Sequence, residues 1–172
     1  MKSIWPKIAL LVLCCGALGF ELWHLRSGSA PVARTPGPAA GSHERDFVLL
    51  PADELNLWTK YFGSGTHAEG WEPTLGDMND AEGALGQIAD LSKNDADANR
   101  RVDDPRNYYR QYLAVAVDGK RKLFLNAVCS TDQNANWRKR LVIAMDGGKC
   151  FWHAVYDPAT QRYSDLTVNG RG

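Results

Sequence analysis

The sequence lacks the short motifs that mark the commonest catalytic and cofactor sites. It has no G-x-S-x-G turn, no phosphate-binding P-loop and no glycine-rich dinucleotide turn. Its four histidines include no pair at H-x-x-x-H spacing, and its four cysteines include no C-x-x-C pair. The sequence therefore predicts no catalytic residue, no cofactor and no metal site. It leaves open an enzyme whose catalytic residues come from distant positions.

The chain also lacks an excess of charge of either sign, because 20 Lys and Arg residues balance 20 Asp and Glu residues. Without a long-range field, no nucleic-acid partner is predicted, and any partner must be recognised locally. The charges are nevertheless divided along the chain. Residues 69–104 hold 10 acidic and 3 basic residues, whereas residues 106–172 hold 5 acidic and 11 basic ones. This division indicates either attraction between two layers of one fold or a basic face for an acidic partner.

Long apolar runs are missing except near the N-terminus, where 13 apolar residues extend from Ile8 to Phe20. Lys2 and Lys7 precede this run, as in an export signal. A helix of this length rises about 20 Å, which is less than the bilayer core of roughly 30 Å. Residues 1–26 are thus predicted to be a signal peptide or an N-terminal membrane anchor. Ala17-Leu18-Gly19 offers a cleavage site.

Residues 27–46 are rich in Pro, Gly and Ala and contain almost no large apolar side chain. Such a segment buries too little surface to offset its ordering entropy, so we expect a flexible linker. A spacer is most useful to a protein that stays attached to something. The sequence therefore favours a single-pass inner-membrane protein that contacts the membrane through its N-terminal segment and carries its domain on the periplasmic side. The alternative is a soluble periplasmic or secreted protein, released by signal cleavage.

Residues 47–172 are predicted to form a single globular domain. A short apolar run at residues 47–50 is typical of an edge strand, and helices are predicted over residues 52–62 and 74–91. Thr74 and Asp77 resemble a capping box at the start of the second helix. Gly83 and Gly86 indicate that this helix is either soft or closely approached by another backbone.

Five β-rich runs follow, at residues 112–117, 122–128, 141–145, 151–156 and 163–168. Tight-turn sequences separate most of them, and strands joined by tight turns are antiparallel. The predicted fold class is therefore α+β, with two N-terminal helices packed on a four- to five-stranded antiparallel meander sheet.

Cys129 and Cys150 are the only cysteines outside the apolar N-terminal segment. In an oxidising compartment such a pair predicts a disulfide that closes a loop of about 20 residues. A plain meander that includes a strand at residues 141–145 would place the two cysteines at opposite ends of the sheet. The predicted bond and the predicted strand order therefore conflict.

Aromatic side chains are dense around the first long strand. Tyr108, Arg110 and Tyr112 share one face by strand alternation, and Trp152 lies on a later strand. Aromatic residues and Arg are common at protein interfaces, so these four residues form a candidate interaction surface. The alternative is ordinary packing inside the sheet.

Two basic triplets, at residues 120–122 and 138–140, suggest a phosphate-binding patch at first sight. They open successive strands that would run in opposite directions. We therefore expect them at opposite ends of the sheet, where they serve as solubilising edge and turn charges.

Four strings carry a resemblance to known proteins: Tyr-Tyr-Arg-Gln-Tyr at 108–112, Asn-Ala-Val-Cys at 126–129, Asp-Gly-Gly-Lys-Cys-Phe-Trp at 146–152 and Val-Asn-Gly at 168–170. With Trp-Glu-Pro-Thr at 71–74, they resemble a family of small uncharacterised bacterial exported or envelope proteins. The resemblance covers about residues 70–170. It supports the domain boundary and the cysteine pair, and it implies no activity and no catalytic residue.

Two functions are compatible with these features. The first is a non-enzymatic module of the cell envelope that binds another protein. The second is an enzyme or small-ligand carrier that uses a cleft between the helices and the sheet, which would show as a concave pocket with convergent titratable groups.

Overall fold

The computed structural model of the protein describes residues 46–63 and 67–170. The chain divides into two units, Met1–Pro31 and Val32–Gly172, and every described residue belongs to the second. The predicted signal or anchor at residues 1–26, and the predicted linker at 27–46 except Asp46, lie outside the described residues. Within the described ranges, no helix has the length and apolar character needed to cross a bilayer.

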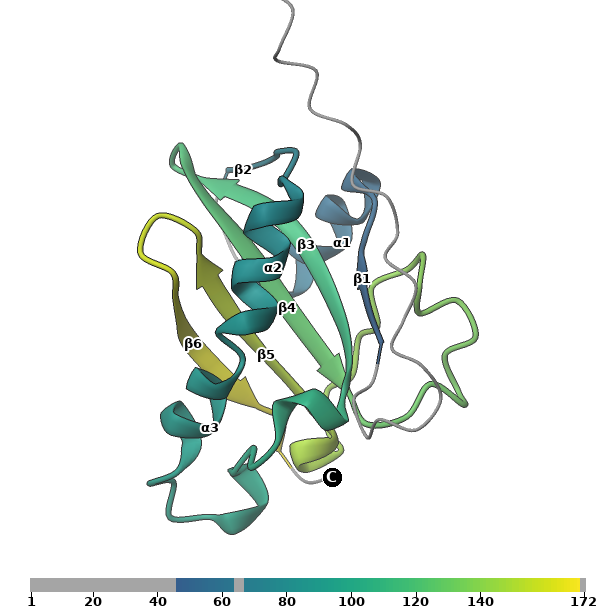
Figure 1. The fold of residues 1–172 in the computed structure, drawn as a ribbon. Coiled ribbons are helices and arrows are strands. Elements are labelled where there is room, and N and C mark those ends of the chain that lie inside the picture. The colour runs from purple at the N-terminus through teal and green to yellow at the C-terminus, as the bar shows by residue number, and fades with distance from the viewer. Residues whose placement is uncertain (1–45, 64–66, 171–172) are drawn as a thin grey trace, which may run out of the picture. The chain divides into compact units, whose positions relative to one another are not determined.

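A six-stranded mixed sheet forms the centre of the fold (Figure 1). The strand order is β1-β3-β4-β5-β6, and β2 pairs with β3 on the same edge as β1. β1 runs parallel to β3, whereas the other pairs are antiparallel. The strands are β1 Phe47–Leu49, β2 Ala68–Gly70, β3 Tyr109–Val117, β4 Lys120–Val128, β5 Phe151–Asp157 and β6 Arg162–Val168.

Helices cover both faces of this sheet. In Figure 1, α2 and α3 lie across one face and α1 lies on the other. The helices are α1 Leu55–Tyr61, α2 Leu75–Gly83 and α3 Gly86–Ser92, with short 3-10 turns at η1 Ala52–Glu54, η2 Ala98–Arg100, η3 Pro105–Asn107 and η4 Gly148–Cys150. The predicted capping box at the start of α2 is present, with the Asp77 backbone N–H donating to the Thr74 hydroxyl.

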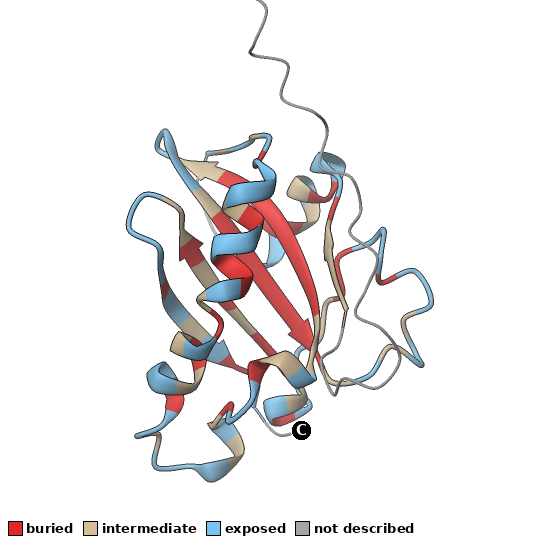
Figure 2. Cartoon of the chain, viewed as in Figure 1, coloured by how far each residue is buried: buried red, intermediate tan, exposed pale blue. Residues whose placement is uncertain are grey.

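The larger core lies between α2, α3 and the sheet. Met78, Ala81, Leu85 and Ile88 are almost fully buried, and they form the apolar stripe that the helical spacing predicts. They pack on a sheet face made of Tyr112, Leu123, Leu125, Trp152, Ala154, Tyr156 and Tyr163. Figure 2 shows the buried residues concentrated on the strands and on the inward side of the helices.

The second face is covered by α1 and by the connection between β4 and β5. Trp58 of α1 packs edge-on against Phe124, with 5.9 Å between the ring centroids. Trp137 and Val142 of the connection bury against Val128. Burial between Phe62 and Phe124 lowers the pKa of His153, which therefore acts as an apolar packing residue on this face.

The α+β class is confirmed, but two finer predictions are wrong. The helices are not N-terminal, because β1 precedes α1 and β2 separates α1 from α2. The sheet is not a plain antiparallel meander, because β1 pairs with β3 in parallel. Turn sequences reveal only neighbouring strand pairs. A parallel pair requires a long crossover, which here contains α1, α2 and α3.

The predicted helix over residues 74–91 is two helices, α2 and α3, that break between Gly83 and Gly86. A methyl group placed on either glycine would meet no described residue within 4 Å. In the described part of the chain, no other backbone therefore packs closely there, and the glycines act by weakening the helix.

Residues 141–145 are not a strand, so β4 pairs directly with β5. This pairing brings Cys129, just after β4, beside Cys150, just before β5. The Cys129 backbone N–H donates to the Cys150 carbonyl oxygen at 2.9 Å. A disulfide joins the two residues, with 4.9 Å between their Cα atoms, and confirms the predicted pair.

This disulfide closes the long connection between β4 and β5. The Cys129→Ser/Cys150→Ser double variant should unfold with a free energy lower by about 3 kcal/mol, because a closed loop of this length restricts the unfolded chain. Urea denaturation of the variant and of the oxidised wild-type protein measures the difference. A difference below about 1 kcal/mol, or two free thiols in the exported wild-type protein, would contradict the prediction.

Candidate functional site

The candidate interaction surface predicted from the aromatic residues is not exposed. Arg110, Tyr112 and Trp152 are no more than 1% exposed, and Tyr108 is only partly exposed. The prediction is wrong because strand alternation shows which residues share a face but not whether a helix covers that face. Here α2 and α3 cover it.

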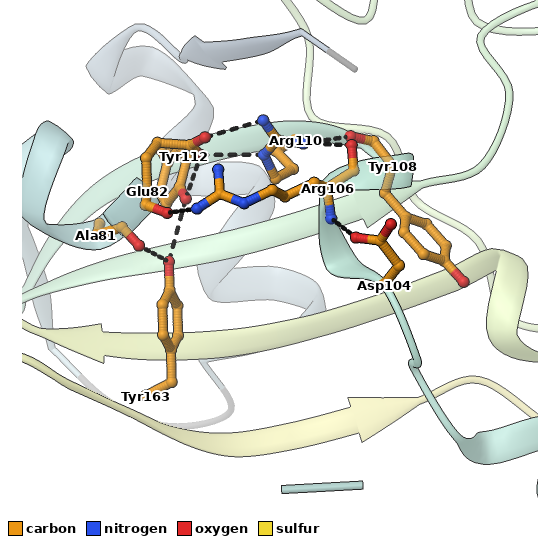
Figure 3. Close-up of polar contacts among 8 residues, drawn as sticks. All are labelled: Ala81, Glu82, Asp104, Arg106, Tyr108, Arg110, Tyr112 and Tyr163. Atoms are coloured by element: carbon orange, nitrogen blue, oxygen red, sulfur yellow. Dashed lines mark hydrogen bonds and ion pairs between the residues drawn. The ribbon is translucent and has the colours of Figure 1, made fainter. Parts of the chain in front are cut away.

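Instead, Arg110 forms a buried ion pair with Glu82 of α2 (Figure 3). The guanidinium Nε and Nη2 donate to the two carboxylate oxygens at 3.0 and 2.9 Å. Its remaining terminal nitrogen, Nη1, donates to the backbone carbonyls of Arg106 and Tyr108. The bidentate geometry holds α2 against β3.

Two tyrosines extend this buried cluster to β6. The Tyr112 hydroxyl donates to a Glu82 carboxylate oxygen at 2.7 Å and lies 3.1 Å from the Tyr163 hydroxyl. Tyr163 in turn donates to the backbone carbonyl of Ala81. Burial raises the pKa of Tyr112 well above its usual value, and the neighbouring Tyr163 and Glu82 raise it further. Burial also raises the pKa of Tyr163. Every polar side chain of the cluster therefore bonds within the protein, as expected of structural support.

A second buried polar cluster lies on the opposite face of β3 and β4. The Gln111 amide nitrogen donates to the backbone carbonyls of Trp137 and Arg140. The Gln111 carbonyl oxygen accepts from Asn126 and from the Val142 backbone N–H, each at 2.9 Å. Residues 141–145 do not pair with the sheet as a strand. The side-chain amides of Gln111 and Asn126 instead hold this loop, between β4 and β5, on the sheet.

Glu54, at the start of α1, fixes the same loop from the other side. One carboxylate oxygen accepts the Leu141 backbone N–H at 2.7 Å, and the other lies 3.0 Å from the Arg140 Nε. Arg138 pairs with Asp46, just before β1. The loop therefore presents its basic residues in a defined position beside β1.

A surface hollow lies there, at a break in the edge of the sheet, and we call it the edge notch. β1 covers one end of the outer edge of β3 and β2 covers the other, which leaves Leu113 and Ala114 between them as a floor. The notch has a volume of about 520 Å³. Its walls are residues 48–53 from β1 and η1, residues 71–73 after β2, and the basic residues 138–140.

A second hollow, of about 700 Å³, lies on the other side of Trp71. It is lined by residues 119–122 at the β3–β4 turn, by Asp77, and by residues 157–159 at the β5–β6 turn. The Trp71 indole N–H donates to the Lys122 carbonyl oxygen at 3.0 Å, and the Arg121 guanidinium lies 5.4 Å from the ring centroid. Trp71 is thus held in place as a shared wall between the two hollows.

The two basic triplets line different hollows, and these hollows adjoin at Trp71. The triplets themselves lie toward opposite ends of β3, as expected. Residues 120–122 pair with residues 115–117, whereas Arg138 pairs with Asp46, whose carbonyl oxygen accepts the Arg110 N–H. No signal in the sequence marks the edge notch, because it arises from the lengths of β1 and β2.

No protein-family model, no curated protein and no solved structure matches this chain. The resemblance to small bacterial envelope proteins therefore stays a prediction.

The buried ion pair should contribute strongly to stability. We expect Glu82→Gln to lower the free energy of unfolding by about 3 kcal/mol or more, because it removes the charge of the carboxylate with which the buried Arg110 guanidinium pairs. Urea denaturation measures the loss, and Glu72→Gln at an exposed position is the matched control, expected within about 0.5 kcal/mol of wild type. Equal losses in the two variants would contradict the role of the pair.

The buried tyrosines predict a loss of stability at alkaline pH. Tyr112 and Tyr163 stay neutral in the folded protein above pH 10, where tyrosines of the unfolded chain ionise. Their contribution is fully present below about pH 10 and falls as pH rises towards their folded pKa values, by about 1.4 kcal/mol per pH unit for each tyrosine. Denaturation curves between pH 9 and 11 measure the slope. The Tyr112→Phe variant should show a smaller slope, and an unchanged slope would contradict the assignment.

Proposed function

We propose that residues 47–172 form a non-enzymatic protein-binding module of the cell envelope, which contacts its partner through the edge notch. The observation that carries this proposal is the open edge of β3 between β1 and β2, flanked by exposed basic residues that the sheet holds in place. Exposed sheet edges are a common means of binding extended protein segments.

The alternative, an enzyme or small-ligand carrier with a cleft between the helices and the sheet, has less support. Met78, Leu85 and Ile88 are at most 1% exposed and the strand residues beneath them at most 7%, so side chains fill that space in the described part of the chain. The polar groups beneath α2 bond to one another.

The disulfide supports a location in an oxidising compartment, such as the periplasm or the extracellular space. We propose that residues 1–26 anchor the protein in the inner membrane, with the domain on the periplasmic side. The alternative is release as a soluble periplasmic or secreted protein after signal cleavage. The mass of the mature protein and its fractionation with membranes distinguish these two forms.

Site-specific photo-cross-linking in the producing cells tests the binding function. A benzophenone amino acid in place of Lys139, in the wall of the notch, should give a discrete higher-mass adduct containing another protein. The matched control places the same group at Arg162, which is also exposed and lies on β6 at the opposite edge of the sheet. We expect no adduct from that position, because the proposed contact involves only one edge.

Adducts of equal yield from both positions, or none from position 139, would contradict a partner at the edge notch. Both variants carry the same bulky group at an exposed site, so a difference between them is not explained by unfolding. Their melting temperatures should match to within a few degrees.

A further inference from the structure

The two edges of the sheet differ in how their backbone N–H and C=O groups are covered. At the β6 edge, the Gln87 side chain of α3 bonds the backbone on both sides of Arg162: Nε2 donates to the Gln161 carbonyl oxygen at 3.2 Å, and Oε1 accepts the Tyr163 N–H at 2.9 Å. Further along, the register shifts by one residue, and Asp165 has a φ of 53°. A covered edge with a bulge does not pair readily with another strand.

At the opposite edge, Ala114 of β3 lies between the residues that pair with β1 and those that pair with β2. The Arg110 N–H donates to the Asp46 carbonyl oxygen, and the Tyr112 carbonyl oxygen accepts the Leu50 N–H at 2.8 Å. Alternate residues of a strand direct their backbone groups to the same side, so the N–H and C=O of Ala114 also point to this edge. Ala116, the next such residue, lies opposite Glu69 of β2.

Within the described residues, no hydrogen bond to the backbone N–H of Ala114 is present, whereas the Gly70–Val115 pair directs the Trp71 N–H toward the Ala114 carbonyl oxygen. β1 ends too early to reach Ala114, and the chain after β2 leaves the sheet at Trp71. One unpaired donor therefore faces the edge notch, beside a carbonyl oxygen that can accept a second hydrogen bond. Backbone groups in such a position favour a partner that can bond both.

The walls of the notch carry charges of both signs on different elements. Arg138 and Arg140 are engaged by Asp46 and Glu54. The Lys139 ammonium, between them, forms no ion pair with a described residue. Asp53 and Glu72, both exposed, line the notch on the η1 side and after β2. A ligand that complements this arrangement carries an acidic group toward Lys139 and a basic group toward the carboxylates.

We infer that the edge notch binds an extended segment of a partner protein, in which one residue pairs with the Ala114 backbone between an acidic and a basic side chain. This inference rests on the proposed protein-binding function and specifies its ligand. The pairing supplies affinity through the backbone, and the bipolar walls supply the direction in which the segment lies.

A protein segment suits the notch better than a free dipeptide. Sites for small ligands usually enclose most of the ligand surface. The notch instead lies at the sheet edge between exposed walls, and beyond Trp71 it adjoins the second hollow, where Lys120 and Arg121 are exposed. A longer chain can cross Trp71 and use both hollows.

Five-residue peptides with blocked ends test the inference on the oxidised domain. The probes are acetyl-Thr-Lys-Val-Glu-Thr-amide and its charge-reversed form, acetyl-Thr-Glu-Val-Lys-Thr-amide, titrated while the Ala114 amide resonance is followed by NMR. One charge order should bind about tenfold more tightly than the other and shift the Ala114 resonance. N-methylation of the central valine in the preferred peptide should weaken binding by about two- to tenfold, as expected for one lost hydrogen bond.

Charge reversal in the protein provides the matching test. Lys139→Glu should weaken binding of the preferred peptide by about tenfold, and replacing the peptide glutamate by lysine should restore it. Lys149→Glu is the control, since Lys149 is also an exposed lysine of the same connection and does not line the notch. It should leave binding unchanged to within about twofold.

Equal binding of the two charge orders, insensitivity to N-methylation, or no binding at millimolar peptide overturns the inference. A free Lys-Glu dipeptide that binds as tightly as the blocked peptides also overturns it, in favour of a small-ligand site. In each of these cases a discrete adduct from position 139 would still support the proposed function. The two proposals can thus fail separately.

Discussion

The buried pair between Glu82 and Arg110 is the contact on which the arrangement of layers depends. It joins α2 to β3, and through Tyr112 and Tyr163 it reaches β6. A guanidinium buried in this way is tolerated only when its donors are bonded, so the carboxylate and the two backbone carbonyls define one position for α2 on the sheet. Apolar contacts alone would allow the helix to slide, because they have little directional preference.

A buried polar side chain also positions a neighbouring segment on the other face of β3. Arg110 points toward α2, and the next residue, Gln111, points toward the loop between β4 and β5 and bonds its backbone. The loop is also closed by the disulfide at its base. β3 is therefore the strand against which both layers are positioned.

The edge notch results from how two short strands end. β1 ends at Leu49, and Pro51 then begins the η1 turn, which takes the chain away from β3. After Gly70 the chain turns away from β3 at Trp71. Between them, Ala114 of β3 has no strand partner among the described residues, while the far edge is covered by Gln87. A fold that protects one edge and leaves a single position of the other without a strand partner offers little template for open-ended pairing, which reduces the risk of aggregation.

The sequence by itself determined the elements whose signals are local. Spacing predicted the buried stripe of Met78, Ala81, Leu85 and Ile88, the capping box predicted the start of α2, and the alternation around Arg110 predicted which side chains share a face. The cysteine pair was also predictable, because only two cysteines lie outside the apolar N-terminal segment. Only the tertiary structure decided that β1 lies parallel to β3, that residues 141–145 form a loop, that the Arg110 face is buried and that Ala114 lies between the residues paired with β1 and those paired with β2. These features depend on contacts between residues far apart in the chain, such as Gln111 with Val142 and Glu54 with Leu141, and periodicity within a segment carries no information about them.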